Sequence, residues 1–248
     1  MKNTEGTFVS VIIAAAGKGT RMNSDINKQY INICGVPVLA RSIGVFQECK
    51  LINEIIVVVN KDDIIFCKKN IIDTYEFTKV TQIVAGGDSR QKSVLNGLNA
   101  VNKDTEIVLI HDGARPFVKI KNIMDSIKGA SEYGACVVGT PVKDTIKFVK
   151  SGEEIDSTPN RDILWAAQTP QSFKREILME GYRKAIEDNF IGTDDSVLVE
   201  RLGIQVKIIM GSYENIKITT PEDIIIAESI LKDKAQIYAR EEFIFNTR

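Results

Sequence analysis

The chain has 248 residues, of which 44% are hydrophobic and 26% charged, and its formal net charge is −1. This composition is ordinary for a globular protein, and the near-neutral charge gives no basis for nucleic-acid or membrane-surface binding through overall basicity. The length is at the upper end of one α/β domain, so we expect a single domain over residues 1–248.

The first predicted element is an apolar run that begins at Val9, and it is typical of a strand buried on both faces of a parallel sheet. The run ends in a loop of small residues, Ala14-Ala15-Ala16-Gly17-Lys18-Gly19-Thr20-Arg21-Met22. Because nothing in this loop is bulky before Lys18, backbone N–H groups can approach a ligand, and Lys18 and Arg21 add positive charge. Met22 stands where a dinucleotide-binding motif needs its third glycine, and the P-loop pattern is absent. The loop predicts a phosphate cradle, with a tight βα turn as the alternative.

Strands and helices then alternate along the next 130 residues. A helix begins at Pro37, with Val38, Leu39, Ile43 and Phe46 at helical spacing, and a second is expected over 64–72. Another contains Val94, Leu98 and Val101, and a fourth covers 120–132. Four further strands are predicted at 54–59, 79–84, 106–110 and 135–140. This alternation predicts a Rossmann-like, doubly wound and mostly parallel sheet, with ligands at the carboxyl ends of the strands.

The pattern changes at Pro141, where charged and apolar residues alternate over 142–149 and return over 154–157 after the Ser151-Gly152 turn. We interpret residues of about 141–164 as a protruding β-hairpin. An isolated hairpin is hard to stabilise, so we expect a dimerisation arm covered by a second subunit; the alternative is a hairpin folded onto its own domain.

The last third of the chain adds a helix over 174–187 and a helix that starts after Gly192, with Thr193 or Asp194 as its cap. A strand follows at 205–210. The final helix begins at Pro221, capped by Thr220, and continues to about 239.

Charged and small residues recur where the predicted strands end, so we expect them to meet at one rim of the sheet. Asp112 there suits a divalent cation together with phosphate oxygens, and its alternative is a turn cap. Arg115 could instead be a surface charge, Lys217 could lie on a solvated strand face, and His111 is expected to be structural. The set that could bind a triphosphate comprises Gly17, Gly19, Arg21, Lys28, Gly86, Gly87, Asp88, Ser93, Asp112, Arg115 and Lys217.

The small-residue loop and seven further motifs, in order over residues 8–232, carry a family resemblance. The small-residue loop resembles the opening motif of sugar-phosphate nucleotidylyltransferases. It is followed by Lys28-Gln29, Gly86-Gly87-Asp88 with Ser93, His111-Asp112-Gly113-Ala114-Arg115-Pro116, Pro141-Val142-Lys143-Asp144-Thr145, Gln168-Thr169-Pro170-Gln171, Gly192-Thr193-Asp194-Asp195, and Asn215-Ile216-Lys217 with Pro221-Glu222-Asp223. Together they resemble the 2-C-methyl-D-erythritol 4-phosphate cytidylyltransferase family of the non-mevalonate isoprenoid pathway.

The resemblance implies that CTP and the polyol phosphate 2-C-methyl-D-erythritol 4-phosphate give 4-diphosphocytidyl-2-C-methyl-D-erythritol and pyrophosphate, by in-line attack of the substrate phosphate on the α-phosphorus. It implies Mg²⁺ as the cofactor, held by Asp112, and Arg21, Lys28 and Lys217 as catalytic residues. The nucleotide would be bound by Ala14, Ala15, Ala16, Gly17, Gly19, Gly86, Gly87, Asp88, Ser93 and Gly113. The second substrate would be bound by Asp112, Arg115, Thr145, Arg161, Thr169 and Thr193, with Thr145 and Arg161 reaching from the arm into the other subunit of a homodimer.

Two alternatives stay open at this point. Ribitol 5-phosphate cytidylyltransferases are similar at Gly19-Thr20-Arg21-Met22, at 169–173 and at Pro159-Asn160-Arg161-Asp162. An inactive CTP-sensing module would keep the base pocket and lose the charge-stabilising groups, but Arg21, Lys28 and Asp112 are all present.

The four cysteines, Cys34, Cys49, Cys67 and Cys136, are scattered and form no C-x-x-C pair. This favours reduced thiols. No apolar segment reaches membrane-spanning length, and residues 1–7 lack a signal-peptide core. We therefore expect a cytoplasmic protein with neither a nucleic-acid nor a membrane partner.

Overall fold

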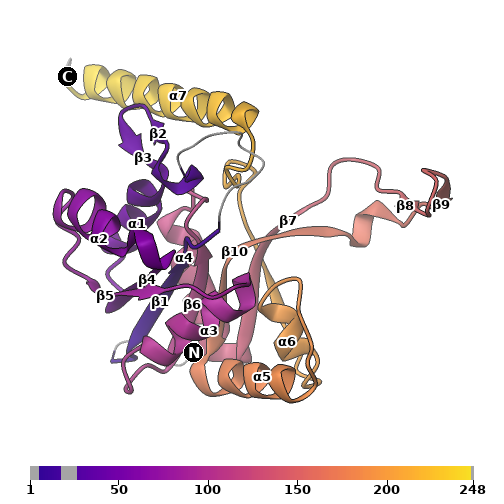
Figure 1. The fold of residues 1–248 in the computed structure, drawn as a ribbon. Helices are drawn as coiled ribbons and strands as arrows, with labels where there is room; N and C mark the ends of the chain where they lie inside the picture. The colour runs from indigo at the N-terminus through magenta and orange to yellow at the C-terminus, as the bar shows by residue number, and fades with distance from the viewer. Residues whose placement is uncertain (1–5, 18–26, 247–248) are drawn as a thin grey trace.

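The computed structural model of the chain describes residues 6–17 and 27–246, and the side chains of 28 and 234–246 are outside this description. A seven-stranded sheet forms its centre, with the strand order β11-β7-β10-β6-β1-β4-β5 (Figure 1). The strands are β1 (Val9–Ala14), β4 (Glu54–Val59), β5 (Val80–Ala85), β6 (Ile107–Asp112), β7 (Ala135–Pro141), β10 (Trp165–Lys174) and β11 (Lys207–Met210).

Strand direction confirms the predicted mostly parallel sheet. β6, β1, β4 and β5 run parallel to one another, and β11 runs parallel to β7. β10 is antiparallel to both of its neighbours, β6 and β7. The carboxyl ends of β1, β4, β5 and β6 therefore lie at the same edge of the sheet, which is where an α/β protein binds its ligands.

Helices cover both faces of the sheet, as expected for a doubly wound fold. Alternate residues of β1 point to opposite faces, so Val11 packs in one core cluster and Ile12 in the other. The first cluster includes side chains of α1 (Val38–Glu48) and α4 (Ile120–Tyr133). The second includes side chains of α3 (Arg90–Ala100), α5 (Arg175–Glu187) and α6 (Ser196–Glu200).

The chain between β7 and β10 leaves the body of the molecule as an arm and carries a small ladder near its tip (Figure 1). The ladder pairs β8 (Phe148–Val149) with β9 (Ile155–Ser157). β8 is shorter than the strand predicted over residues 142–149. Five large apolar side chains of the arm are exposed: Ile146, Phe148, Val149, Ile155 and Ile163. The base of the arm is part of the main sheet, where Trp165 is paired with Pro141.

Three other elements differ from the prediction. β10 was not predicted as a strand. The helix expected over 64–72 is a short helix, α2 (Ile64–Cys67), that continues as a π-helical turn, Lys68–Asp73. A two-residue ladder, β2 (Asn32–Ile33) with β3 (Val36–Pro37), precedes α1.

The last helix, α7 (Pro221–Asn246), begins where predicted and runs further than residue 239. The carboxylate of Asp223 accepts hydrogen bonds from the backbone N–H groups of Thr219 and Thr220, at 2.7 and 2.8 Å, which stabilises the start of the helix. Among the residues that the structure describes, no helix is both long and apolar enough to cross a bilayer.

Candidate active site

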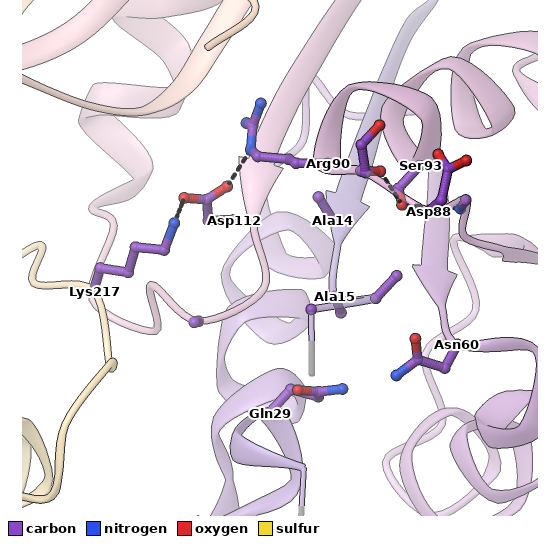
Figure 2. A pocket seen from close by; sticks show the side chains of 14 residues that line it. Ala14, Ala15, Gln29, Asn60, Asp88, Arg90, Ser93, Asp112 and Lys217 are labelled. Carbon is purple, nitrogen blue, oxygen red and sulfur yellow. Dashed lines mark hydrogen bonds and ion pairs between the residues drawn. The ribbon is translucent and has the colours of Figure 1, made fainter. Parts of the chain in front are cut away.

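A cavity of about 440 Å³ lies at the carboxyl edge of the sheet (Figure 2). Its walls come from the end of β1, the turn before α3, the end of β6 and the segment before α7, so residues far apart in sequence meet there. It is lined by Ala14, Ala15, Ala16, Gly17, Gln29, Asn60, Gly87, Asp88, Ser89, Arg90, Ser93, Asp112, Ala114 and Lys217.

The small-residue loop forms one wall of this cavity from Ala14 to Gly17. Its backbone is anchored on both sides, because Ala15 N–H donates to the carbonyl of Val58 at 2.8 Å and Gly113 N–H donates to that of Ala14 at 2.9 Å. A side chain on Gly113 would meet Ala15 and Leu39, so this glycine permits the close approach of β6 to the loop. Gly19, Arg21 and the side chain of Lys28, which were predicted for this site, lie outside the described residues.

The turn between β5 and α3 forms the opposite wall. Ser93 Oγ donates to the carbonyl of Ser89 at 2.8 Å and accepts from Gly87 N–H at 3.0 Å, which fixes the turn. Gly86 has no room for a side chain, since a Cβ there would overlap Ala16 and lie 2.9 Å from Ser93 Oγ. The side chain of Asp88 is largely exposed at the rim. Of the two predicted glycines, Gly86 therefore allows the turn to lie against the loop after β1, whereas Gly87 lies against Lys92.

Asp112, at the end of β6, is surrounded by three cations. Its carboxylate lies 2.7 Å from Lys217 Nζ, 3.3 Å from Arg90 Nε and 3.9 Å from Arg115 Nε. Burial alone would raise the pKa of Asp112, but Arg90 and Lys217 outweigh it, so the pKa lies well below the ordinary value of 3.8. Asp112 is therefore ionised at neutral pH and holds the cations in place.

A second cavity, of about 330 Å³, lies on the other side of this charge cluster. Arg90, Asp112 and Lys217 line both cavities and so form the boundary between them. Three other residues of its lining were predicted to bind the second substrate, namely Arg115, Thr169 and Thr193. The rest of the lining consists of Ala167, Gln168, Gln171 and Asp194.

A hydrogen-bonded chain fixes the hydroxyl of Thr169 at this boundary. Asp112 N–H donates to Thr169 Oγ1 at 3.1 Å, and Thr169 Oγ1 lies 3.0 Å from His111 Nδ1. His111 Nε2 lies 3.0 Å from the carbonyl of Arg115, which can only accept, so the proton is on Nε2 and the Thr169 hydroxyl donates to Nδ1. His111 is fully buried and has a hydrogen-bond partner at each ring nitrogen, as expected for a structural histidine.

The acidic groups around the cavities limit how a metal ion could be held. Within the described ranges, no group of three or more histidine, cysteine or acidic side chains could enclose a metal. Asp112 is one carboxylate, 7% exposed, and lines both cavities. Its Oδ1 faces Arg90 and its Oδ2 faces Lys217, so a Mg²⁺ ion would fit beside this carboxylate by taking most of its ligands, and the compensating negative charge, from substrate phosphates and water.

Several lining residues were missed by the sequence analysis as functional candidates, and two of them are of particular interest. Arg90 stands two residues after the Gly86-Gly87-Asp88 motif, yet an arginine at the start of a helix looks like an ordinary surface charge. Gln29 is 2% exposed and lines the first cavity, and its buried Nε2 has no hydrogen-bond partner among the residues that the structure describes (Figure 2). Its place directly after Lys28, a predicted catalytic residue, was the one feature of the sequence that could have indicated a role for Gln29 in the site.

Thr145 and Arg161 are not brought to either cavity of their own chain. Both are exposed residues of the arm, and Arg161 Nη1 donates to the carbonyl of Lys143 at 2.8 Å. Their predicted role is in the site of another subunit, so it stays a prediction.

A small-residue loop after the first strand, a cation-rich boundary and two adjoining cavities on a doubly wound sheet are features that suit a nucleotidyltransferase. Comparison with known proteins supports this class. The family model "2-C-methyl-D-erythritol 4-phosphate cytidylyltransferase" (IspD) matches residues 9–233. The chain belongs to this 2-C-methyl-D-erythritol 4-phosphate cytidylyltransferase family.

Individual members of this family align with the chain along most of their length. The chain is 52% identical over 224 residues to the 2-C-methyl-D-erythritol 4-phosphate cytidylyltransferase of Caldanaerobacter subterraneus, covering 90% of this chain and 99% of the relative. It is 53% identical over 222 residues to that of Clostridioides difficile, covering 90% and 93%. The crystal structure of 4-diphosphocytidyl-2C-methyl-D-erythritol synthase from Anaerococcus prevotii matches with a TM-score of 0.81 at 37% identity, covering 93% of this chain and all of that one.

Proposed function

We propose that the chain transfers a cytidylyl group from CTP to 2-C-methyl-D-erythritol 4-phosphate, giving 4-diphosphocytidyl-2-C-methyl-D-erythritol and pyrophosphate. The observation that carries this proposal is the pair of cavities that share Arg90, Asp112 and Lys217 as their boundary. Two anionic substrates in these cavities would meet at that boundary, as transfer between two phosphates requires. Family membership supports this substrate pair over the ribitol 5-phosphate and CTP-sensing alternatives.

The first cavity would hold CTP. The loop over 14–19 would offer backbone N–H groups to the triphosphate, and Arg21 and Lys28 would stabilise charge on the transferring group and on the leaving pyrophosphate. The turn with Gly86, Gly87, Asp88 and Ser93, together with Gly113, would bind cytosine and ribose. This turn lies against Ala16, so the base and the triphosphate would occupy neighbouring parts of one cavity.

The second cavity would hold methylerythritol phosphate. Arg115 supports this assignment, because its buried Nε finds no hydrogen-bond partner in the described part of the chain and its carboxylate neighbour is 3.9 Å away. A phosphate oxygen would satisfy that donor. Thr169, Thr193 and Lys217 would contact the same substrate, and Asp112 would accept from one of its hydroxyl groups.

Mg²⁺ fits the site as a substrate-bound ion. Asp112 would supply one carboxylate oxygen, and phosphate oxygens and water would supply the others. When bound, the ion adds positive charge against the triphosphate; this chain's own residues orient the two phosphates and exclude water from the space between them.

The arm would make a homodimer, with the chain as one domain over 1–248 and the arm at about 141–164. Exposed apolar residues on the arm, among them Phe148 and Ile155, support this proposal because a partner surface would bury them. Thr145 and Arg161 would then enter the partner's second cavity. We also propose a cytoplasmic location, supported by four free cysteines, three of them buried.

Pyrophosphate release tests the reaction. Purified protein is given CTP and Mg²⁺ with either 2-C-methyl-D-erythritol 4-phosphate or ribitol 5-phosphate. Turnover with the first substrate alone is the expected result. Turnover with ribitol 5-phosphate alone would refute the substrate assignment, and CTP binding without pyrophosphate release would support the sensing alternative.

Subunit mixing tests the arm. Arg161→Ala and Lys28→Ala proteins are each expected to be nearly inactive, and after co-refolding about a quarter of wild-type activity should return, because one site in each mixed dimer has both residues intact. No recovery in a dimer confirmed by light scattering, or full activity in a monomer, would contradict the proposed arm contact.

A further inference from the structure

A buried chain of polar groups leads from the interior to the boundary between the two cavities. Tyr182 Oη donates to Asp195 Oδ1 at 2.6 Å, and Arg90 Nη1 donates to Asp195 Oδ2 at 2.8 Å. Arg90 Nε then faces Asp112 Oδ1 at 3.3 Å. Arg90 thus joins a carboxylate in the interior to the carboxylate at the boundary, and Figure 2 shows its side chain extending toward Asp112.

Asp195 and Tyr182 are too deeply buried to touch a substrate. Each is 1% exposed, and neither lines either cavity. The backbone of Asp195 is itself fixed, because the N–H groups of Asp195 and Ser196 both donate to Gln171 Oε1 at 3.1 Å. The side-chain carboxylate of Asp195 therefore reaches the boundary through Arg90, whereas its backbone contacts Gln171, which lines the second cavity.

The guanidinium of Arg90 is held at two of its three nitrogens. A planar group bound at Nε and Nη1 by carboxylates on either side has a fixed orientation. Within the described part of the chain, Nη2 has no hydrogen-bond partner, and the Arg90 side chain is 33% exposed in a residue that lines both cavities. A donor with a fixed direction is thus left for a ligand at the boundary.

Charge explains why a fixed donor is needed there. When the substrate phosphate attacks, a new P–O bond forms to the α-phosphorus and the bond from the α-phosphorus to the pyrophosphate oxygen breaks. The step needs no proton transfer. Two anions have to approach one another, and their repulsion must be met by preorganised positive charge. Lys217 lies on one side of Asp112 and Arg90 on the other.

We infer that Arg90 is a further catalytic residue that contacts the phosphate groups of both substrates where they meet, and that Asp195, hydrogen-bonded by Tyr182, is the residue that positions it. This inference rests on the proposed placement of the two substrates in the two cavities. A purely structural role of Asp195, linking the start of α6 to α3, would instead affect stability and leave catalysis unchanged.

A double-mutant cycle on kcat separates these roles. Arg90→Met is expected to lower kcat about 100-fold or more, with the KM for CTP changed less than about threefold because base and ribose contacts are untouched. Asp195→Asn should lower kcat about tenfold, and Tyr182→Phe by less, since the aromatic packing remains. Because Asp195 acts through Arg90, Asp195→Asn should have no further effect on kcat in the Arg90→Met background. Additive losses in the double variant would overturn the positioning role.

Matched controls are available on the surface. Asp188 makes an ion pair with Arg201 at 2.6 Å, and Tyr133 is an exposed tyrosine of α4, so Asp188→Asn and Tyr133→Phe should leave kcat unchanged. If thermal melting shows that Arg90→Met is unfolded, Arg90→Lys replaces it in the cycle. Absence of wild-type turnover would refute the proposed function, whereas normal wild-type turnover with an unchanged Arg90 variant would refute this inference alone.

Discussion

The stability of the protein should fall when the pH is lowered from 7 to 5, because of His111. Burial lowers the pKa of this imidazole to about 4, and the hydrogen bond to the Arg115 carbonyl and the charge of Asp112 oppose it only in part. In the unfolded chain the same group has a pKa near 6.5. Between these two values the unfolded state binds more protons than the folded state, so acidification favours unfolding.

The expected loss follows from the two pKa values. Protonation of the unfolded state costs about 2 kcal/mol of unfolding free energy between pH 7 and pH 5, and about 3 kcal/mol once the pH passes the folded pKa. His111 is the one histidine in the sequence. Carboxylates with lowered pKa, such as Asp112, lose their contribution only below about pH 4.5, so they do not contribute in this window.

Urea unfolding at pH 7, 6 and 5 measures the effect, with the slope against urea compared to confirm the same transition. A His111→Gln variant should lose most of the pH dependence in this window. Because the chain has one histidine, its ring proton gives one NMR resonance, whose titration reports the pKa directly. A resonance titrating near pH 6.5, or wild-type stability that is flat from pH 7 to 5, would refute the reasoning.

Three substitutions test the cavities. Gly86→Ala should raise the KM for CTP about tenfold, since the new Cβ overlaps Ala16 in the loop wall, whereas Gly44→Ala, whose nearest neighbour would be 3.9 Å away, should behave as wild type. Gln29→Leu removes a buried donor that faces the first cavity, so calorimetry should show weaker CTP binding by about tenfold; unchanged affinity would mean that the amide does not contact the nucleotide. Lys217→Met should reduce kcat/KM for the polyol phosphate about 100-fold with little change in CTP affinity, and an equal loss for both substrates would contradict the assignment of Lys217 to the second substrate.

The parallel strands were predictable because they are buried on both faces and read as continuous apolar runs, as in Ile55 to Val59. β10 carries no such pattern. Its central residues Gln168, Thr169, Gln171 and Ser172 are buried yet polar, and they are satisfied by distant partners, as when Ser172 Oγ donates to Ser126 Oγ at 2.9 Å. A local reading of the sequence contains no information about such partners.

The candidate site was predictable where its residues stand at strand ends, as Asp112 does, because the topology of an α/β sheet brings those ends together. Arg90 was not predictable in this way. The orientation of its side chain depends on Asp195, which is 105 positions away in sequence. Nothing near Arg90 in the sequence distinguishes it from a solvated helix residue. Long-range pairing of this kind is visible only in the folded chain.

One strand connects the arm to the second cavity. β10 pairs with β7 at Trp165, at the base of the arm, and four residues later it presents Thr169 to the ligand space. A contact that immobilises the arm therefore also restricts the strand that carries Thr169. By thermodynamic reciprocity, a substrate that binds at Thr169 more tightly when the arm is immobilised must favour the immobilised arm by the same factor. Subunit association and substrate affinity would then be two readouts of a single coupling energy, measurable as a subunit dissociation constant that falls when the second cavity is filled.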